Sequence, residues 1–420
     1  MTKSNKLYFR NDVLEKSKSV MLFDLGIEGH HANYIRYIIE YWIQNQIHKN
    51  LFILVTSKFL EIHSNLLNLK SGVRENRIKF LTISSNEEVN LKLQETILSR
   101  AFFEWNIFCD YANQLKIDEG LLMYFDYFQI PIIFGKRSPC RISGIYFRPT
   151  LHYKFLSSYK FSWKESLRDL RKNLILRLAL KQPQLKTLFC LDPLAIEHMQ
   201  KFNSKTKVIY LPDPMEPHIV DPSRVKLLRE GLNIQDSEKK ILLLFGVLDD
   251  RKGIYQVLEA VQKLDINVSS QICLLFVGKV ALHEKEKFQK NTLHTSNSCP
   301  VEIHVRDEFV PDEDVKLYFE IADLILIPYQ QHVGMSGVFL HAVAAKKPLI
   351  SSDYGLLGYL TRQYHLGLSI DCSSSEEIKN GVLQCIVNQE NGVVNSVPLD
   401  DLIAIHQYTE FSRVIFEKFN

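Results

Sequence analysis

The run ILLLFGVLDDRKGIYQVLEAVQKL at residues 241–264 decides the fold. It begins as an apolar strand that stops at Gly246, continues as a short polar loop, and ends with apolar residues at helical spacing. Parallel α/β sheets repeat this strand-to-helix unit and bind ligands at the carboxyl ends of their strands. Arg251 and Lys252 follow the strand, where two cations suit a diphosphate. An exposed turn is the alternative for an RKG triplet alone.

A second loop, GMSG at 334–337, follows the predicted strand DLILIP about 80 residues later. Its glycines, Gly334 and Gly337, permit a tight turn around Met335 and Ser336. The helix that follows would present unpaired amides, which form an anion site. Each such contact is worth only about 0.3–1 kcal/mol when exposed, so several must converge. We expect this glycine loop and the loop that carries Lys252, the lysine loop, to meet at one pyrophosphate. The alternative is that the glycine loop only caps the helix and allows close packing.

Outward from these loops, short apolar runs alternate with helical patterns along almost the whole chain. The alternation predicts two Rossmann-like α/β domains, each with a parallel sheet covered by helices on both faces. The 420 residues, 46% of them hydrophobic, suffice for two cores. The predicted strands of the first half are 20–25, 51–56, 78–83, 121–125, 142–147, 187–191 and 208–212. Those of the second half are 241–247, 271–277, 301–305, 323–328 and 347–352.

Three prolines in LPDPMEPH separate the two sets of strands and disfavour regular structure. We therefore predict an N-terminal domain over 1–212 and a C-terminal domain over 213–395. The segment 396–420 has helical spacing, and we expect one helix there that packs back toward the N-terminal domain.

Composition excludes several classes of protein. The formal net charge of +3 is far below that of a dedicated nucleic-acid binder. No apolar run reaches the roughly 18 residues of a spanning helix, and the first residues lack the apolar centre of a secretory signal. Seven scattered cysteines without a CxxC pair indicate reduced core residues. We expect a cytoplasmic protein that binds no nucleic acid.

The blocks FGVLDDRKG, FVG, FVPDEDVKLYFEIADLILIPY and SGVFLHAVAAKKPLISSDYG resemble the C-terminal domain of family 4 glycosyltransferases in order and spacing. The resemblance covers about residues 240–372 and implies the GT-B fold, in which two Rossmann-like domains with parallel sheets face a central cleft. It implies that 1–212 is the N-terminal acceptor domain and that 213–395 is the C-terminal nucleotide-sugar domain. It further implies hexose transfer from a nucleotide-sugar donor with retention at the anomeric carbon, of the kind used in polysaccharide biosynthesis. It implies no cofactor and no bound metal, and the sequence has no HExxH motif.

Carried over residue by residue, the family's loop lysine falls on Lys252, which would neutralise the leaving diphosphate, with Arg251 as a neighbouring cation. The family's arginine after Gly246 falls on Val247. Its paired glutamates, which contact the donor sugar and the ribose, fall on Val333 and His341, so neither carboxylate is present. The histidine either bonds a ribose hydroxyl or is a satisfied helix residue.

In the first half, the loop DLGIEGHHANYIRYIIEYW supplies Gly26, Gly29 and His30 at the carboxyl end of the first strand. GT-B resemblance places this loop near donor phosphates or acceptor; a simple turn and cap is the alternative. Asp126 and Arg148 also follow predicted strands. Either would orient an acceptor hydroxyl, although loop salt bridges are the commoner role.

The segment SWKESLRDLRKNLILRLALK at 162–181 interleaves cations with leucines. The pattern favours a solvated helix packed on its own domain; the alternative is peripheral contact with the inner face of a membrane or with a lipid acceptor.

Together these features predict a glycosyltransferase acting on a glycan, lipid or small-molecule acceptor. A catalytically silent relative that binds nucleotide sugars or a protein partner is the main alternative, because the glutamates are missing. A phosphorylase or epimerase on the same fold is the third.

Overall fold

The structure is a computed structural model that describes residues 18–27, 29, 31–69, 77–153, 162–234, 238–388 and 396–417. Contacts divide the chain into two compact units. The first comprises the described residues up to Ile145 together with Ala179–Thr187, and the second comprises Tyr146–Leu178 and the residues from Leu188 onward.

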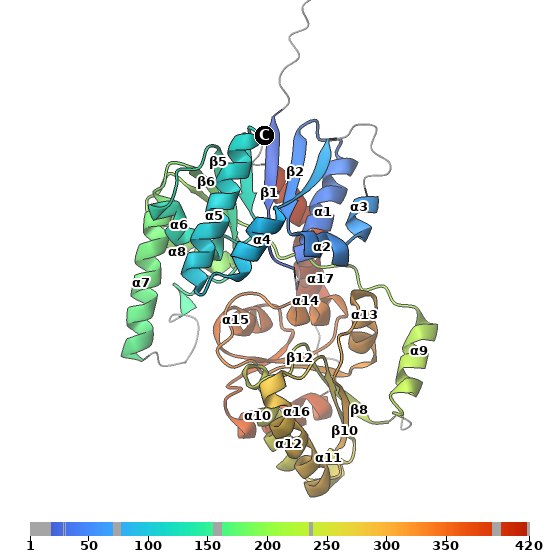
Figure 1. Cartoon of the computed structure of the whole chain (residues 1–420). Coiled ribbons are helices and arrows are strands. Elements are labelled where there is room, and N and C mark those ends of the chain that lie inside the picture. The colour runs from blue at the N-terminus through green and yellow to red at the C-terminus, as the bar shows by residue number, and fades with distance from the viewer. Residues whose placement is uncertain are drawn as a thin grey trace, which may run out of the picture. The chain divides into compact units, whose positions relative to one another are not determined.

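The first sheet has seven strands in the order β3-β2-β1-β4-β5-β6-β7 (Figure 1). The strand β1 pairs in parallel with β2 and β4, and Val20 is opposite Leu51 on one side and Glu119 on the other. The strands are β1 (Ser19–Phe23), β2 (Asn50–Val55), β3 (Ile78–Thr82), β4 (Glu119–Leu122), β5 (Arg141–Tyr146), β6 (Leu185–Cys190) and β7 (Lys207–Tyr210).

Helices connect these strands, as parallel pairing requires. They are α1 (His31–Gln44), α2 (Ser57–Ile62), α3 (Asn65–Asn68), α4 (Ser85–Lys92), α5 (Ile97–Gln114), α6 (Gln129–Phe134), α7 (Trp163–Leu180) and α8 (Pro193–Gln200), with a 3₁₀ turn η1 (Phe125–Tyr127). Helix α9 (Pro222–Gly231) then leads to the second sheet.

The second sheet has six parallel strands in the order β10-β9-β8-β11-β12-β13. They are β8 (Lys240–Phe245), β9 (Ile272–Val277), β10 (Glu302–Arg306), β11 (Leu324–Ile327), β12 (Leu349–Ser352) and β13 (Gly367–Ile370). Alternate residues of β8 pack into two apolar clusters, Leu243 into one and Leu242 into the other. The sheet is therefore buried on both faces, which explains the uninterrupted apolar run of this strand.

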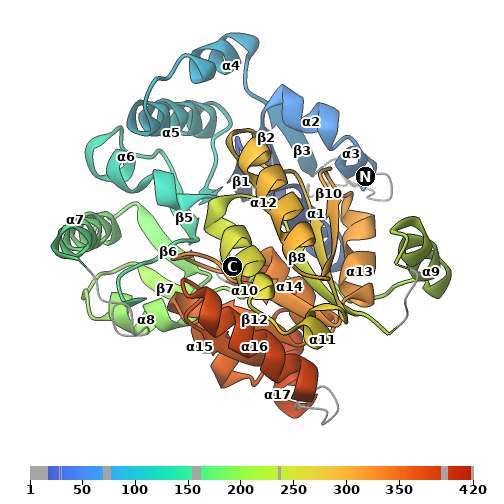
Figure 2. The same ribbon diagram turned by 90° about the horizontal axis from the view of Figure 1, so that it is seen from below.

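Helices cover both faces of this second sheet (Figures 1 and 2). One cluster includes residues of α13 (Asp312–Ile321), α14 (Gly337–Ala344), α15 (Gly355–Gln363) and α17 (Ser396–Ile405). The other includes residues of α10 (Ile254–Gln262), α12 (Lys285–Ser298) and α16 (Ser375–Asn388). Short elements complete the unit: η3 (Asp250–Lys252), α11 (Ile266–Ser269), η4 (Leu282–Glu284) and α18 (Tyr408–Phe416).

All twelve predicted strands are present within a few residues of their expected bounds. A thirteenth, β13, was not predicted, because four half-buried residues at a sheet edge carry almost no hydrophobic pattern. The prediction of a single helix over 396–420 is wrong, because α17 and α18 are separate helices. The helical conformation is interrupted between them. There, Gln407 forms an isolated β-bridge with Met215, and the His406 Nδ1 atom lies 2.7 Å from the Asp213 carbonyl oxygen.

The change from one sheet to the other lies between Tyr210 and Lys240, the interval that contains the predicted boundary at 212/213. The contact-based units differ from that boundary, because Tyr146–Leu178 and the residues from Leu188 group with the second unit. Bonds such as the one from the Gly334 amide to the Tyr153 hydroxyl, 2.8 Å long, tie them there.

The seven cysteines are free thiols and five of them are buried, as the sequence predicts. Among the described residues, no helix combines the length and the apolarity needed to cross a bilayer.

Candidate functional site

The loop after β8 turns sharply at two glycines. Gly246 and Gly253 have φ angles of 109° and 71°, in the region that L side chains rarely adopt. Between them, the 3₁₀ turn η3 ends at Lys252, and its amide donates to the Asp249 carbonyl at 3.1 Å. Helix α10 starts directly after Gly253, so the loop delivers Lys252 to the carboxyl edge of the sheet.

Lys252 is held at this edge by an aromatic ring. Its ammonium nitrogen lies 3.7 Å from the centroid of the buried Tyr329 ring, close enough for a cation–π contact. A Cβ placed on Gly246 would be 3.5 Å from this nitrogen and 3.9 Å from the Val338 side chain in the first turn of α14. The ammonium therefore lies over Gly246, beside the start of that helix.

Arg251 has a different environment. Its side chain is 76% exposed, and its guanidinium donates twice to one oxygen of Asp249, at 2.5 and 3.1 Å. The other carboxylate oxygen of Asp249 is buried and has no hydrogen-bond partner among the described residues. The two predicted cations thus differ, since Lys252 is half-buried against an aromatic ring and Arg251 is tethered at the surface.

The glycine loop after β11 leads into α14. Gly334 has φ of 91°, and a Cβ there would come within 2.8 Å of the Phe147 carbonyl oxygen. The Met335 carbonyl is 3.2 Å from the Nε2 atom of His332. Ser336 is the buried N-cap residue of α14, and its side chain makes no capping hydrogen bond. Gly337 begins the helix and has open space where a Cβ would be, so a ligand could approach the first amides.

The two loops converge at one edge of the sheet. Their strands, β8 and β11, are neighbours, and the Gln330 amide donates to the Arg251 carbonyl at 2.8 Å. A Cβ on Gly253 would lie only 2.2 Å from the Pro328 carbonyl oxygen. This close backbone approach joins the lysine loop to the glycine loop.

Arg148 also belongs to this edge, although its position after β5 suggests the first sheet. The Phe147 carbonyl contacts Gly334, and the Arg148 side chain reaches the same glycine. Its charge is sensed nearby: the pKa of His332 is lowered to about 4, chiefly by burial and in smaller part by the cations Lys252, Arg148 and Arg251, although the hydrogen bond to the Met335 carbonyl raises it. Three cations therefore surround one loop.

His341 and Val333 are the residues on which the family resemblance leads us to expect the paired glutamates to fall. The His341 ring packs 5.2 Å from the Phe319 ring of α13, and burial lowers its pKa to about 4. Val333 packs against the apolar core. These positions thus hold a neutral imidazole and an aliphatic side chain.

A separate cavity of about 330 Å³ lies at the carboxyl end of the first sheet. Its lining comprises Phe23, Asp24, Leu25, Gly26, His31, Ile97, Arg100, Ala101, Glu104, Tyr124, Tyr127 and Phe128. Among the predicted residues, Gly26 is part of this wall. Gly29 is exposed with φ of 85°, Asp126 lies in η1 outside the lining, and His30 falls outside the described residues.

Asp24 and His31 form the polar centre of this cavity, and neither was among the residues predicted from the sequence. The His31 Nδ1 atom lies 2.7 Å from the buried Asp24 carboxylate, whose other oxygen accepts from the Gly26 amide at 3.0 Å. Burial lowers the pKa of His31, but the hydrogen bond and charge of Asp24 outweigh it, so the net pKa is raised. A Cβ on Gly26 would be 2.3 Å from the imidazole. The signal was present, because Asp24 directly follows the first strand and His31 starts the first helix.

Aromatic rings and a second ion pair complete the cavity. Tyr124 stacks at 5.5 Å from both the His31 and Tyr127 rings. Arg100 donates to Glu104 at 2.7 Å, and burial raises the pKa of this glutamate despite its partner. The cavity therefore combines aromatic faces with hydrogen-bonding groups.

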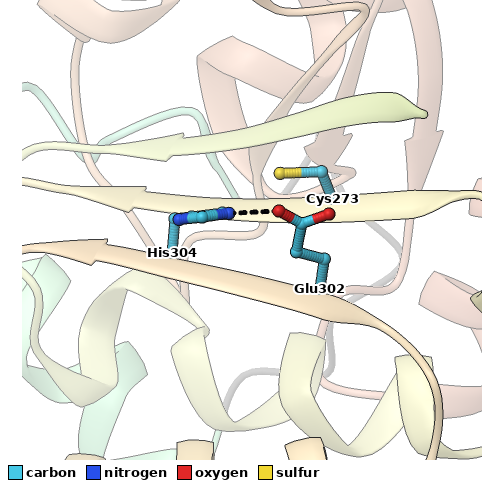
Figure 3. A group of neighbouring side chains, drawn as sticks. All are labelled: Cys273, Glu302 and His304. Carbon is cyan, nitrogen blue, oxygen red and sulfur yellow. Dashed lines mark hydrogen bonds and ion pairs between the residues drawn. The ribbon is translucent and has the colours of Figure 1, made fainter. Parts of the chain in front are cut away.

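One group of metal-type ligands lies elsewhere in the second sheet (Figure 3). Cys273 of β9 and Glu302 and His304 of β10 bring their ligand atoms within 4.8 Å of one another. The carboxylate of Glu302 already bonds the His304 Nε2 atom at 2.5 Å and the Lys239 ammonium at 2.7 Å. Burial raises the pKa of Cys273 to about 12, which favours the protonated thiol. Glu302 therefore already has hydrogen-bond partners in His304 and Lys239. The group lies near the amino ends of the strands, away from the two loops.

The approach of Gly253 to Pro328 can be tested by adding one methyl group. Gly253→Ala should lower the free energy of unfolding by about 2 kcal/mol or more, because φ is positive and a backbone carbonyl blocks the Cβ. Gly231→Ala, at the exposed end of α9 with open space, is the matched control and should be neutral or stabilising. Equal stability of the two variants in urea unfolding would refute the contact.

Two histidines predict a pH dependence of stability. The folded-state pKa values of His332 and His341 are both about 4, below the ordinary 6.5, so the unfolded chain binds more protons between these values. Their contribution is complete above about pH 6.5 and is lost as the pH falls toward 4. The double variant His332→Gln/His341→Gln should lose less unfolding free energy than the wild type between pH 7.5 and pH 5.0 in urea titrations. An identical loss would contradict the assignment.

Comparison with known proteins shows that the second sheet is similar to a described family. Residues 229–392 match the family model of glycosyl transferases group 1. A lipopolysaccharide 1,2-N-acetylglucosaminetransferase of Salmonella typhimurium is 28% identical over 170 residues, which are 39% of this chain and 43% of that protein. The aligned part thus spans less than half the length of the curated relatives.

Solved structures match the chain over most of its length. Anabaena HepE in complex with UDP aligns with a TM-score of 0.65 at 12% identity, over 96% of this chain and 99% of that one. WaaG, a glycosyltransferase involved in lipopolysaccharide biosynthesis, aligns with a TM-score of 0.62 at 14% identity, over 95% and 98%. The chain therefore has the GT-B fold, and its residues 229–392 are similar to the group 1 glycosyl transferases.

Proposed function

We propose that the protein is a glycosyltransferase that takes a hexose from a nucleotide-sugar donor. The observation that carries this proposal is the convergence of Lys252 and the start of α14 over Gly246. A half-buried ammonium beside the first amides of a helix is an arrangement that suits a pyrophosphate. The match of residues 229–392 to the group 1 glycosyl transferases supports it.

In this proposal the chain itself supplies the positive charge for the leaving group. Lys252 contacts the diphosphate, the amides around Ser336 and Gly337 bond its oxygens, and Arg148 and Arg251 add charge from the rim. Negative charge grows on the leaving oxygen as the glycosidic bond breaks. Groups already in place stabilise that state more than the bound substrate. We accordingly propose transfer without a bound metal.

Stereochemistry and donor contacts follow from the family resemblance. We propose retention at the anomeric carbon, with the departing phosphate oxygen taking the acceptor's proton. His341 and Val333 carry no charge in place of two carboxylates, so donor sugar and ribose must be held by weaker contacts. The altered pair favours a donor or acceptor range that differs from that of the family.

For the acceptor we propose the cavity of the first unit. It offers the stacked rings of Tyr124 and Tyr127 and the polar Asp24–His31 pair, a combination that suits the apolar faces and hydroxyls of a sugar. A glycan or a lipid-linked sugar would satisfy both features. Gly26 matters here because its missing side chain leaves room for the His31 ring.

Lys252→Ala tests the donor half directly. We expect sugar transfer to fall by about 10² or more, the scale for loss of one transition-state donor. Lys252→Arg, which keeps the charge, should retain more activity than the alanine variant. Lys290→Ala, an exposed lysine on α12, is the matched control and should be unaffected. Near-normal turnover of Lys252→Ala in a product assay would remove this residue from the mechanism.

The replaced glutamates favour a second candidate, a nucleotide-sugar binding protein without turnover. The two functions separate in a panel of UDP-, GDP- and ADP-sugars assayed for both melting temperature and product. A transferase shows stabilisation with product formation or slow donor hydrolysis; a silent binder shows stabilisation alone. If no nucleotide raises the melting temperature, both candidates fail.

A further inference from the structure

Helix α7 (Trp163–Leu180), the green helix of Figure 1, presents five large apolar residues to solvent. The exposed fractions are 73% for Trp163, 59% for Leu167, 66% for Leu170, 57% for Leu174 and 38% for Leu178. Their spacing of three and four residues places them on one side of the helix. We call these five residues the α7 stripe; it runs about 25 Å along the helix.

The opposite side of α7 faces the protein and carries the helix's acidic residues. Asp169 accepts a hydrogen bond from the Thr150 hydroxyl at 3.3 Å, whereas Glu165 accepts one from the Ser162 amide at the start of its own helix, at 2.8 Å. Both acids are partly buried, and farther along this side Leu176 and Leu180 are fully buried. The first half of the helix thus turns polar groups inward and leucines outward, the reverse of an ordinary surface helix.

Cations border the α7 stripe. Lys164, Arg168 and Arg171 are exposed along one side of it, and Lys181 follows its end. The segment 162–181 has six cations and two acids, and the two acids lie on the protein side. The outward surface therefore combines apolar area with positive charge.

From this arrangement we propose that the α7 stripe lies on an anionic lipid bilayer, parallel to its surface. The leucines and Trp163 would enter the boundary of headgroups and acyl chains, while the long basic side chains reach the lipid phosphates. The exposed charges that border the stripe are all positive, which matches the negative surface of an anionic bilayer. A protein partner that packed on the leucines would not require this uniform charge. Eight charged residues within 162–181 exclude a spanning orientation. This inference is independent of the proposed reaction.

Tryptophan fluorescence gives a direct readout, because the protein has three tryptophans and two are buried. Trp42 is 3% exposed and Trp105 is fully buried, so a shift of emission on adding vesicles reports Trp163. With vesicles of phosphatidylcholine containing about 30% phosphatidylglycerol, we expect a blue shift and co-sedimentation of the full chain. Phosphatidylcholine alone should bind weakly, and about 0.5 M salt should reduce binding by screening.

The variant Leu170→Glu/Leu174→Glu should lower partition into anionic vesicles at least about tenfold, because it removes apolar area and adds repulsive charge. Both side chains are exposed, so the fold should tolerate the change; the melting temperature checks this. Leu282→Glu, at an 86% exposed leucine in η4, is the matched control and should bind like the wild type. Trp163→Phe should lose the spectral shift and keep most of the co-sedimentation.

Three results would overturn the proposal. The first is no binding of the wild type to anionic vesicles, and the second is unchanged binding of the double leucine variant. The third is a concentration-dependent dimer that disappears in that variant while vesicles bind neither protein, which would make the stripe an interface between two copies of the chain.

Discussion

The close approach of two backbone loops at the centre of the second sheet is the constraint on which the candidate donor site depends. Gly253 lies against the Pro328 carbonyl, and the Gln330 amide bonds the Arg251 carbonyl at 2.8 Å. Adjacent parallel strands bring both loops to one edge. Only glycine permits the contact, since any Cβ would overlap the carbonyl. Without this contact, nothing would hold the Lys252 loop next to the loop that leads into α14.

Much of this architecture could be predicted from periodicity, because buried parallel strands are short apolar runs that need no tertiary information to recognise. The lysine loop and the glycine loop were found in the same way, as polar turns at strand ends. Contacts between distant segments could not be predicted. Nothing in the sequence indicates that Arg148 reaches Gly334. Nor does it indicate that His406, which follows α17, bonds the Asp213 carbonyl at the point where the C-terminal segment divides into two helices.

In the first unit too, features of the local sequence could be predicted, whereas contacts between residues far apart in the chain could not. Gly26 was predicted from its place after a strand, yet the reason for glycine is the imidazole of His31 against its Cα. The Asp24–His31 pair joins two ends of one strand-to-helix connection, and Arg100, Glu104 and Tyr124 come from farther along the chain. Exposure is likewise a property of the folded chain: the leucines of α7 have the spacing of a core-facing stripe and lie in solvent.

Hydrogen exchange in the presence of a nucleoside diphosphate can show whether the two loops bind one ligand. With UDP, GDP or ADP, whichever raises the melting temperature, we expect slower amide exchange at both 246–253 and 334–339, with the protection of the two segments saturating at the same ligand concentration. Protection of only one segment, or protection confined to other parts of the chain, would contradict a shared pyrophosphate site.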